Sequence, residues 1–184
     1  MRMKAFGQIP LRCETATPDA ALAIAALRTA VALNLTTRYG RGHWSLKTSA
    51  KGALFGLRTS LVRVVWRESR LVATFALATK KPWAIDRKYF SACAKPLYLT
   101  NMAVDPELQR QGIGRLCIED AKRIARAWPS DAIRLDAYDA EAGDGDFYAK
   151  SGFREVGRVA YKGTPLVYFE MLLCKDTYAE SEGR

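Results

Sequence analysis

Two glycines stand one residue apart in the segment QRQGIGR, which runs from Gln109 to Arg115. An apolar run and the pair Asp105-Pro106 precede this segment and a helical pattern follows it, so it lies where a strand gives way to a helix. The first N–H groups of a helix lack internal partners and carry the positive end of the helix dipole. Glycine lets a ligand approach that main chain closely, and the arginines add positive charge. The segment therefore predicts a phosphate-binding site.

A second segment, FYAKSGF, runs from Phe147 to Phe153. The order of strand, turn, QRQGIG, amphipathic helix, strand and FYAKSGF resembles the GNAT superfamily of N-acetyltransferases. The acyl-coenzyme A motif of that family is Gln or Arg, two residues, Gly, one residue, then Gly or Ala, and Gln109 to Gly114 match it. The aromatic pair with lysine and Gly-Phe is matched by the second segment. The close resemblance covers Leu97 to Phe153, and two motifs at this spacing are far more specific than either alone.

The resemblance implies an α/β fold with an acyl-coenzyme A site. The expected fold is a mixed, mostly antiparallel twisted sheet with helices on both faces, and the cofactor, acetyl-coenzyme A, is expected in a cleft between two splayed central strands. Main-chain N–H groups of the glycine segment would cradle the pyrophosphate, and the preceding strand would serve the pantetheine arm and polarise the thioester carbonyl. The residues assigned to the cofactor are Met102, Ala103, Val104, Gln109, Arg110, Gln111, Gly112, Ile113, Gly114 and Arg115.

The same resemblance assigns two side chains to catalysis. Tyr148 matches the usual general acid of the family, whose phenol protonates the departing thiolate. Asp136 lies at the strand position where ribosomal-protein alanine acetyltransferases of the family carry a glutamate, and its shorter carboxylate would act as the base directly or through water. Thr100 and Asn101 replace carboxylates of some relatives, and Glu141 replaces an asparagine that commonly contacts pantetheine. The acceptor is expected to be a primary amine of a small molecule or a protein N-terminus.

The elements that must position these residues are predicted from periodicity and helix breakers. Thr17-Pro18-Asp19 is a helix start with Thr17 as its cap, and the alanine-rich helix that follows is expected to end before residue 40. Residues 39–56 lack sustained periodicity and are predicted to be mostly loop. Residues 61–79 predict a β-hairpin, and residues 80–96 a long connection of the kind that often carries function.

The second half of the chain contains the clearer patterns. Strands are predicted over 97–104 and 132–139, separated by an amphipathic helix that begins at Gly112 and ends near Pro129. A short helix follows, and two further strands are expected around a turn over residues 162–165. Asp144 or Asp146 is the expected cap of the short helix, and Gly152 its end.

Length and composition favour one domain. The chain has 184 residues, enough to bury a core without disulfides or metals, and we expect one acetyltransferase domain over residues 1–174 with a polar tail over 175–184. The four cysteines, at positions 13, 93, 117 and 174, lack C-x-x-C spacing, which indicates free thiols and no metal site. The sequence shows no apolar signal-peptide core and no run of about 18 apolar residues, so a cytoplasmic protein without a membrane anchor is expected.

Other aromatic residues and the single histidine have plainer interpretations. His43 is expected to be a loop residue rather than a base or ligand. Trp44, Trp66, Trp83 and Tyr89, taken one by one, are expected to anchor the core or the surface. Trp83 and Tyr89 together are candidates for the acceptor pocket, because the family builds part of that pocket from the long connection.

Three functions remain open. The first is an acetyl-coenzyme A-dependent N-acetyltransferase, and the second is a non-catalytic acyl-coenzyme A-binding module of the same fold. The third is a nucleic-acid-binding protein, suggested only by the net charge of +10, which favours anionic partners. A Rossmann nucleotide site fits less well, because GIGRLC lacks the third glycine and the turn before the glycines is long. Dimers are frequent in the family, and the sequence leaves the oligomeric state open.

Overall fold

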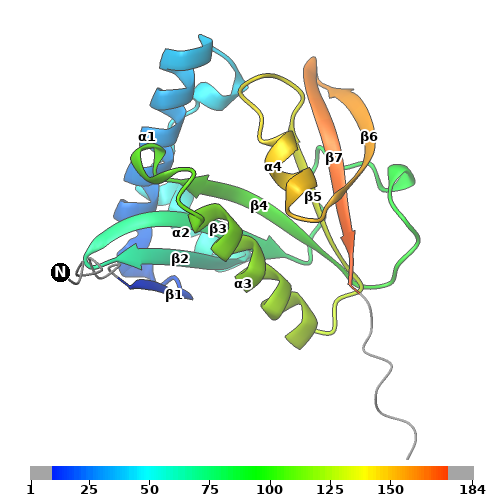
Figure 1. The fold of residues 1–184 in the computed structure, drawn as a ribbon, viewed down its shortest axis with the longest axis horizontal. Helices are drawn as coiled ribbons and strands as arrows, with labels where there is room; N and C mark the ends of the chain where they lie inside the picture. The colour runs from blue at the N-terminus through cyan, green and yellow to red at the C-terminus, as the bar shows by residue number, and fades with distance from the viewer. Residues whose placement is uncertain (1–9, 174–184) are drawn as a thin grey trace, which may run out of the picture.

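A single seven-stranded sheet forms the centre of the molecule (Figure 1). The structure is a computed structural model that describes residues 10–173. The strands lie in the order β1-β2-β3-β4-β5-β7-β6 across the sheet. Their bounds are β1 Leu11–Thr15, β2 Leu61–Arg67, β3 Arg70–Ala78, β4 Pro96–Val104, β5 Ala132–Tyr138, β6 Arg154–Tyr161 and β7 Thr164–Leu172.

Helices cover both faces of the sheet, with α1 and α2 on one face and α3 on the other (Figure 1). The α-helices are α1 Ala21–Tyr39, α2 Ala50–Thr59, α3 Ile113–Ala127 and α4 Gly145–Lys150. Short 3-10 turns are η1 Pro18–Ala20, η2 His43–Ser45, η3 Arg87–Tyr89 and η4 Pro106–Leu108. The expected fold class is confirmed: a mixed, mostly antiparallel sheet between two helical layers.

The two central strands, β4 and β5, make the only parallel pair between the described strands, and they soon separate. They are paired only from Pro96 opposite Ala132 to Tyr98 opposite Arg134. Beyond that point β4 continues beside β3, and β5 continues beside β7. The cleft predicted between splayed central strands is therefore present.

Most predicted elements are found, and two were missed. The prediction of a loop over 39–56 was wrong in part, because α2 begins at Ala50 with Ser49 as its cap. The edge strand β1 was not predicted from its mixed sequence. Of the predicted side-chain caps, neither Thr17 nor Asp144 makes a capping hydrogen bond, although both stand at the expected positions. The predicted polar tail lies outside the described residues.

The first helix corrects another prediction. Pro18–Tyr39 is long and apolar enough, by length and composition, to cross a bilayer, so the statement that no such segment exists was wrong. Its buried residues Ala21, Ile24 and Leu27 pack in one cluster with Val64 of β2. A helix that covers a sheet needs apolar residues on its inner side. Composition alone therefore does not distinguish such a helix from one that spans a membrane.

Two ion pairs fix α3 and the turn before it to the sheet. Arg63 of β2 donates from Nε to Oδ2 of Asp120 on α3 at 2.7 Å, and both side chains are about nine-tenths buried. Burial opposes ionisation of Asp120, but hydrogen bonds from Arg63 and Arg123 outweigh it and lower the pKa of the carboxyl. In the turn, Arg70 of β3 donates to Oδ2 of Asp105 at 2.5 Å. These pairs hold α3 and the turn before it against β2 and β3.

We predict that Asp120→Ala destabilises the fold by about 3 to 5 kcal/mol, because Arg63 is then a buried cation without its partner. For a chain of this size that is a fall of roughly 10 °C in melting temperature, measurable by thermal or urea unfolding. The neighbouring surface pair gives the control: Glu119→Ala breaks only the exposed contact with Lys122 and should cost about 0.5 kcal/mol or less. Equal losses in the two variants would contradict the role given to the buried pair.

Candidate active site

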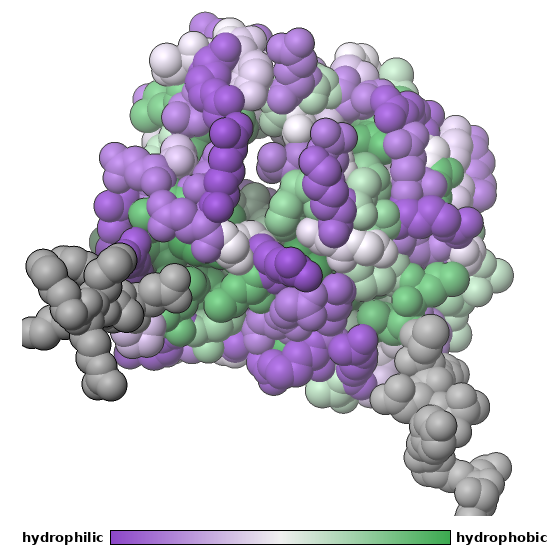
Figure 2. All heavy atoms as spheres, viewed as in Figure 1, coloured by the Kyte–Doolittle hydropathy of each residue, from purple (hydrophilic) through white to green (hydrophobic). Residues whose placement is uncertain are grey.

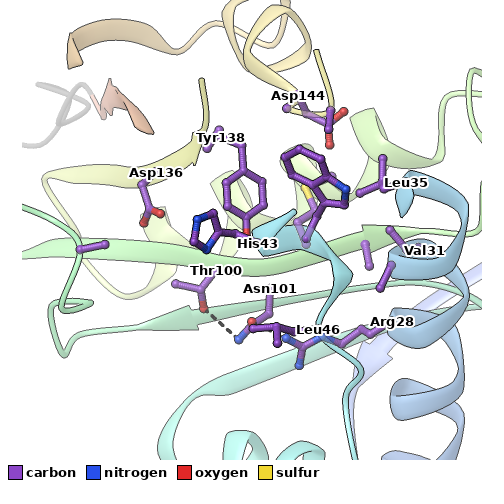
Figure 3. Close-up of a pocket in the computed structure, with 18 of the residues that line it drawn as sticks. Arg28, Val31, Leu35, His43, Leu46, Thr100, Asn101, Asp136, Tyr138 and Asp144 are labelled. Carbon is purple, nitrogen blue, oxygen red and sulfur yellow. Dashed lines mark hydrogen bonds between the residues drawn. The ribbon is translucent and has the colours of Figure 1, made fainter. Parts of the chain in front are cut away.

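A pocket of about 590 Å³ opens where β4 and β5 have separated. Figure 2 shows this face of the molecule hollowed between the α1 side and the α4 side. In Figure 3, α1 and the loop after it form one wall, β4 lies beneath, and β5 with the loop leading to α4 forms the opposite wall. The lining side chains most relevant to chemistry are Arg28, Asn101, Met102, Asp136, Tyr138 and Tyr148.

A bulge in β4 lies in the pocket. The register with β3 skips one place, so that Asn101 and Met102 together stand opposite a single β3 residue. Asn101 has a φ of 54°, in the left-handed region that asparagine tolerates better than most residues. Such a bulge bends its strand and increases the local twist, which helps β4 turn away from β5. The main chain at Met102 and Ala103 therefore faces a space that no strand fills.

The predicted cofactor residues fall into two groups. Met102 and Ala103 line the pocket. The others lie outside its lining: Val104, Gln109, Arg110, Gln111, Gly112, Ile113, Gly114 and Arg115. They run from the last residue of β4 through η4 to the first turn of α3. The two groups adjoin at Met102, since a Cβ built on Gly114 would lie 3.6 Å from the Met102 Cε.

The two glycines of the motif have different structural reasons. Gly112 is the N-cap of α3 with a φ of 84°, and no atom lies within 4 Å of where its Cβ would be. This open space beside a helix N-terminus fits a phosphate group, and the exposed Arg110 and Arg115 flank it. Gly114 instead admits an aromatic ring, because its Cβ would lie 3.1 Å from the Phe147 Cζ. The first glycine is therefore suited to a ligand and the second to packing.

Tyr148 reaches the pocket from α4 through an aromatic cluster. Its ring contacts those of Phe147, Phe153 and Phe169 at centroid distances of 5.3 to 5.8 Å. Its hydroxyl points to the Met102 Sδ at 3.9 Å. Burial raises the pKa of Tyr148 above its ordinary value, and the carboxylates of Asp144 and Asp136 raise it further. The phenol is therefore held in its protonated form at neutral pH, as a proton donor must be.

Asp136 faces the pocket from the free part of β5 (Figure 3). It lies beyond the last residue of β5 that pairs with β4, and opposite Tyr168 of β7. Burial raises the pKa of Asp136, and no charged partner among residues 10–173 offsets that effect. A carboxylate in such a place has a higher proton affinity than one in water, which suits a general base.

Several pocket residues with polar or aromatic side chains were not predicted from the sequence. Trp44, expected to be a core or surface anchor, lines the pocket and packs edge to face against Tyr138 at 5.7 Å between centroids. Arg28 enters from α1 and donates to the Asn101 Oδ1 at 2.5 Å. A signal for Arg28 existed, because it is the only charged residue between Asp19 and Arg38. His43, expected in a loop, lies in η2 and lines the same wall.

The long connection before β4 contributes one of its two predicted pocket residues. Trp83 lines the mouth of the pocket and is 84% exposed, whereas Tyr89 does not line it. The Tyr89 ring instead packs on β6 against Gly157, where a Cβ would clash with the ring. The Tyr168 hydroxyl fixes the loop by donating to the Ala84 carbonyl and accepting from the Asp86 N–H. The outer wall of the pocket is thus anchored to the strand beside Asp136.

The comparisons with known proteins agree with this geometry. The sequence model of the acetyltransferase (GNAT) domain matches residues 59–155, just over half of the chain. No curated protein sequence gives a match.

Solved structures show a similar fold at low sequence identity. The ribosomal-protein-S18-alanine N-acetyltransferase from Escherichia coli has a TM-score of 0.66 and 16% identity, over 92% of this chain and 99% of that one. The PaiA N-acetyltransferase from Thermoplasma acidophilum, in complex with coenzyme A, has a TM-score of 0.68 and 14% identity, over 89% of this chain and 99% of that one. A YncA acetyltransferase from Salmonella typhimurium with acetyl-coenzyme A has a TM-score of 0.65 and 13% identity, over 93% of this chain and 98% of that one.

We predict that Asp136→Asn raises the melting temperature at pH 7 to 8, because it removes a desolvated charge from the folded state. A carboxyl whose pKa is raised by folding loses stability as pH rises through that pKa, so the gain should vanish below the ordinary pKa of 3.8. Thermal unfolding of both proteins from pH 3 to 8 measures this. The exposed Asp19→Asn serves as control, and a gain that does not depend on pH would contradict burial as the cause.

Proposed function

Because the chain belongs to the acetyltransferase (GNAT) family, we propose that it transfers an acetyl group from acetyl-coenzyme A to a primary amine by direct attack. One observation carries the proposal: the β4 bulge, the start of α3 and the Tyr148 hydroxyl all meet at Met102, at the edge of a pocket that also contains Asp136. An acyl transfer needs each of these groups within one small volume. A cytoplasmic location, a domain over residues 1–174 and a possible homodimer stay predictions.

The residues at the start of α3 fit the phosphates of acetyl-coenzyme A. Its pyrophosphate would accept hydrogen bonds from main-chain N–H groups between Gln111 and Arg115, beside the open space at Gly112. The guanidinium groups of Arg110 and Arg115 would add charge from the solvent side. The main chain from Met102 to Val104, which has no strand on its β5 side, would bond the pantetheine arm. The relatives solved with coenzyme A and acetyl-coenzyme A support this assignment.

In the proposed reaction each polar group of the pocket has one task. Acetyl-coenzyme A supplies the activated acetyl thioester. Asp136 accepts a proton from the acceptor ammonium, directly or through water, and leaves a neutral amine with a free electron pair. The Met102 N–H would stabilise negative charge on the carbonyl oxygen as the new C–N bond forms. Tyr148 then donates its proton to the sulfur as the C–S bond breaks. The attacking nitrogen, positively charged once the C–N bond has formed, loses its second proton through water to the Tyr148 phenolate, and Asp136 releases its proton to solvent. The products are an amide and free coenzyme A.

We predict that coenzyme A binds to the chain and that Gly112→Asp weakens its binding by at least about 10-fold, because the new carboxylate would stand where a phosphate is expected. Aspartate tolerates a φ of 84° moderately well and meets no atom there, so the fold should survive. Gly163→Asp is a matched control, since Gly163 has a φ of 80° and equally open space, in the β6–β7 turn. Calorimetry measures both. A folded natural protein without coenzyme A binding would rule out the proposed function.

We predict that Tyr148→Phe lowers kcat by roughly 100-fold or more and leaves coenzyme A affinity within about threefold, since it removes only the proton donor. Release of free coenzyme A over a panel of amines gives the rate, and calorimetry gives the affinity. Tyr98→Phe is the control, because Tyr98 is also buried but its hydroxyl has no partner among the described residues and lies outside the pocket lining. Tight cofactor binding without turnover of any amine would favour the non-catalytic acyl-coenzyme A module.

A further inference from the structure

Arg28 stands in the pocket without an acidic partner. Its guanidinium has five N–H donors, and its hydrogen bond within residues 10–173 is the one that Nη2 makes to the Asn101 Oδ1 at 2.5 Å. None of the ion pairs formed in this part of the chain involves Arg28. Burial lowers the pKa of Arg28, a cation that is partly removed from solvent and forms no ion pair within residues 10–173. Such a group in a pocket is suited to binding an anion.

The position of Arg28 relates it to the reacting groups. Its partner Asn101 is part of the β4 bulge, directly before Met102, where the thioester carbonyl is expected. Arg28 and Asp136 enter the pocket from opposite walls, one from α1 and the other from β5 (Figure 3). The pocket therefore presents a cationic side and an anionic side to one bound molecule.

Apolar and aromatic side chains form part of the pocket surface between these two charges. Val31 and Leu35 of α1 line the pocket beside Arg28, and Leu46 follows from the loop after α1 (Figure 3). The edge-to-face pair of Trp44 and Tyr138 joins the loop after α1 to the end of β5. An acceptor that contacts these surfaces would bury an apolar body.

We propose that the acceptor is an amino acid with an apolar body, whose carboxylate binds Arg28 and whose ammonium group lies at Asp136. The proposal rests on the proposed function and names its substrate class. The two parallel N–H groups of a guanidinium match the two oxygens of a carboxylate. Arg28 is thus a specificity-determining residue, and it acts on substrate binding rather than on the proton transfers. Amines without an anionic group leave its charge unpaired in a poorly solvated place, and should be poor substrates.

Matched acceptors test the proposal through the release of coenzyme A from acetyl-coenzyme A. The pairs are leucine with 3-methylbutylamine, phenylalanine with phenethylamine, and 6-aminohexanoate with hexylamine, because the last pair separates the two charges further. Leucinamide lacks the carboxylate charge of leucine, and its ammonium group loses a proton more readily than that of leucine. A preference for leucine over leucinamide therefore cannot come from the reactivity of the amine. The aminophosphonate analogue of leucine distinguishes a carboxylate site from a phosphate site. We expect kcat/KM at least about 10-fold higher for the carboxylate member of at least one pair.

The Arg28 variants supply the decisive comparison. Arg28→Gln should lower kcat/KM for the preferred amino acid by about 10- to 100-fold, mainly through KM, and change the carboxylate-free amines by less than about threefold. Arg28→Lys should restore part of the loss, since it keeps the charge without the planar fork. Arg38→Gln, on the exposed side of the same helix, is the control and should resemble the natural protein. Coenzyme A binding should be unchanged in all three variants.

Several outcomes would overturn the proposal and leave the proposed function intact. These are a preference for the carboxylate-free amines, a preference for the phosphonate, or an equal effect of Arg28→Gln on every acceptor. If coenzyme A binds but no acceptor is acetylated, the proposed transferase activity is ruled out. Calorimetry of the amino acids with the coenzyme A-loaded protein then shows whether Arg28 still binds a carboxylate. Saturable binding that Arg28→Gln abolishes would support that site, and absence of binding would overturn it.

Discussion

The separation of β4 from β5 is the constraint on which the site depends. The two strands pair over three residues only, and a β4 bulge then turns the strand away. Main-chain groups beyond Tyr98 would be costly to bury without partners, so the gap must face solvent or a ligand. The pocket, the free edge at Met102 and the approach of Tyr148 all follow from this opening.

The elements around the opening are held by interactions that lie away from the site. The buried pair of Arg63 and Asp120 fixes α3 to the sheet, so the N-terminus of that helix stays beside β4. Tyr168 holds the long loop before β4, and thereby the wall that carries Trp83. A site for acyl transfer requires groups placed to within fractions of an ångström, which rigid packing supplies better than loops do.

Charge is distributed unevenly in the pocket, so that acidic groups lie on one side and a cation lies on the other. The partly buried Asp136 and the buried Tyr148 lie on the β5 and α4 side, where desolvation raises the pKa values of the carboxyl and the phenol. The cation Arg28 lies on the α1 side. The net charge of +10 therefore says little about the acceptor, because single groups in a poorly solvated space outweigh a diffuse surface charge. The basic surface is compatible with a nucleotide cofactor and does not require nucleic acid as partner.

The sequence by itself determined the family and the sheet with helices on both faces, and it predicted segments for phosphate binding and for proton transfer, because these depend on short motifs and on local periodicity. It did not place α2, since the glycines at 52 and 56 weaken a helix that tertiary packing of Ala53 stabilises. Only the tertiary structure joined Arg28, Trp44 and Tyr138 to Asp136. Those residues meet across the gap between α1 and β5, and no local pattern specifies a contact between segments so far apart in the chain.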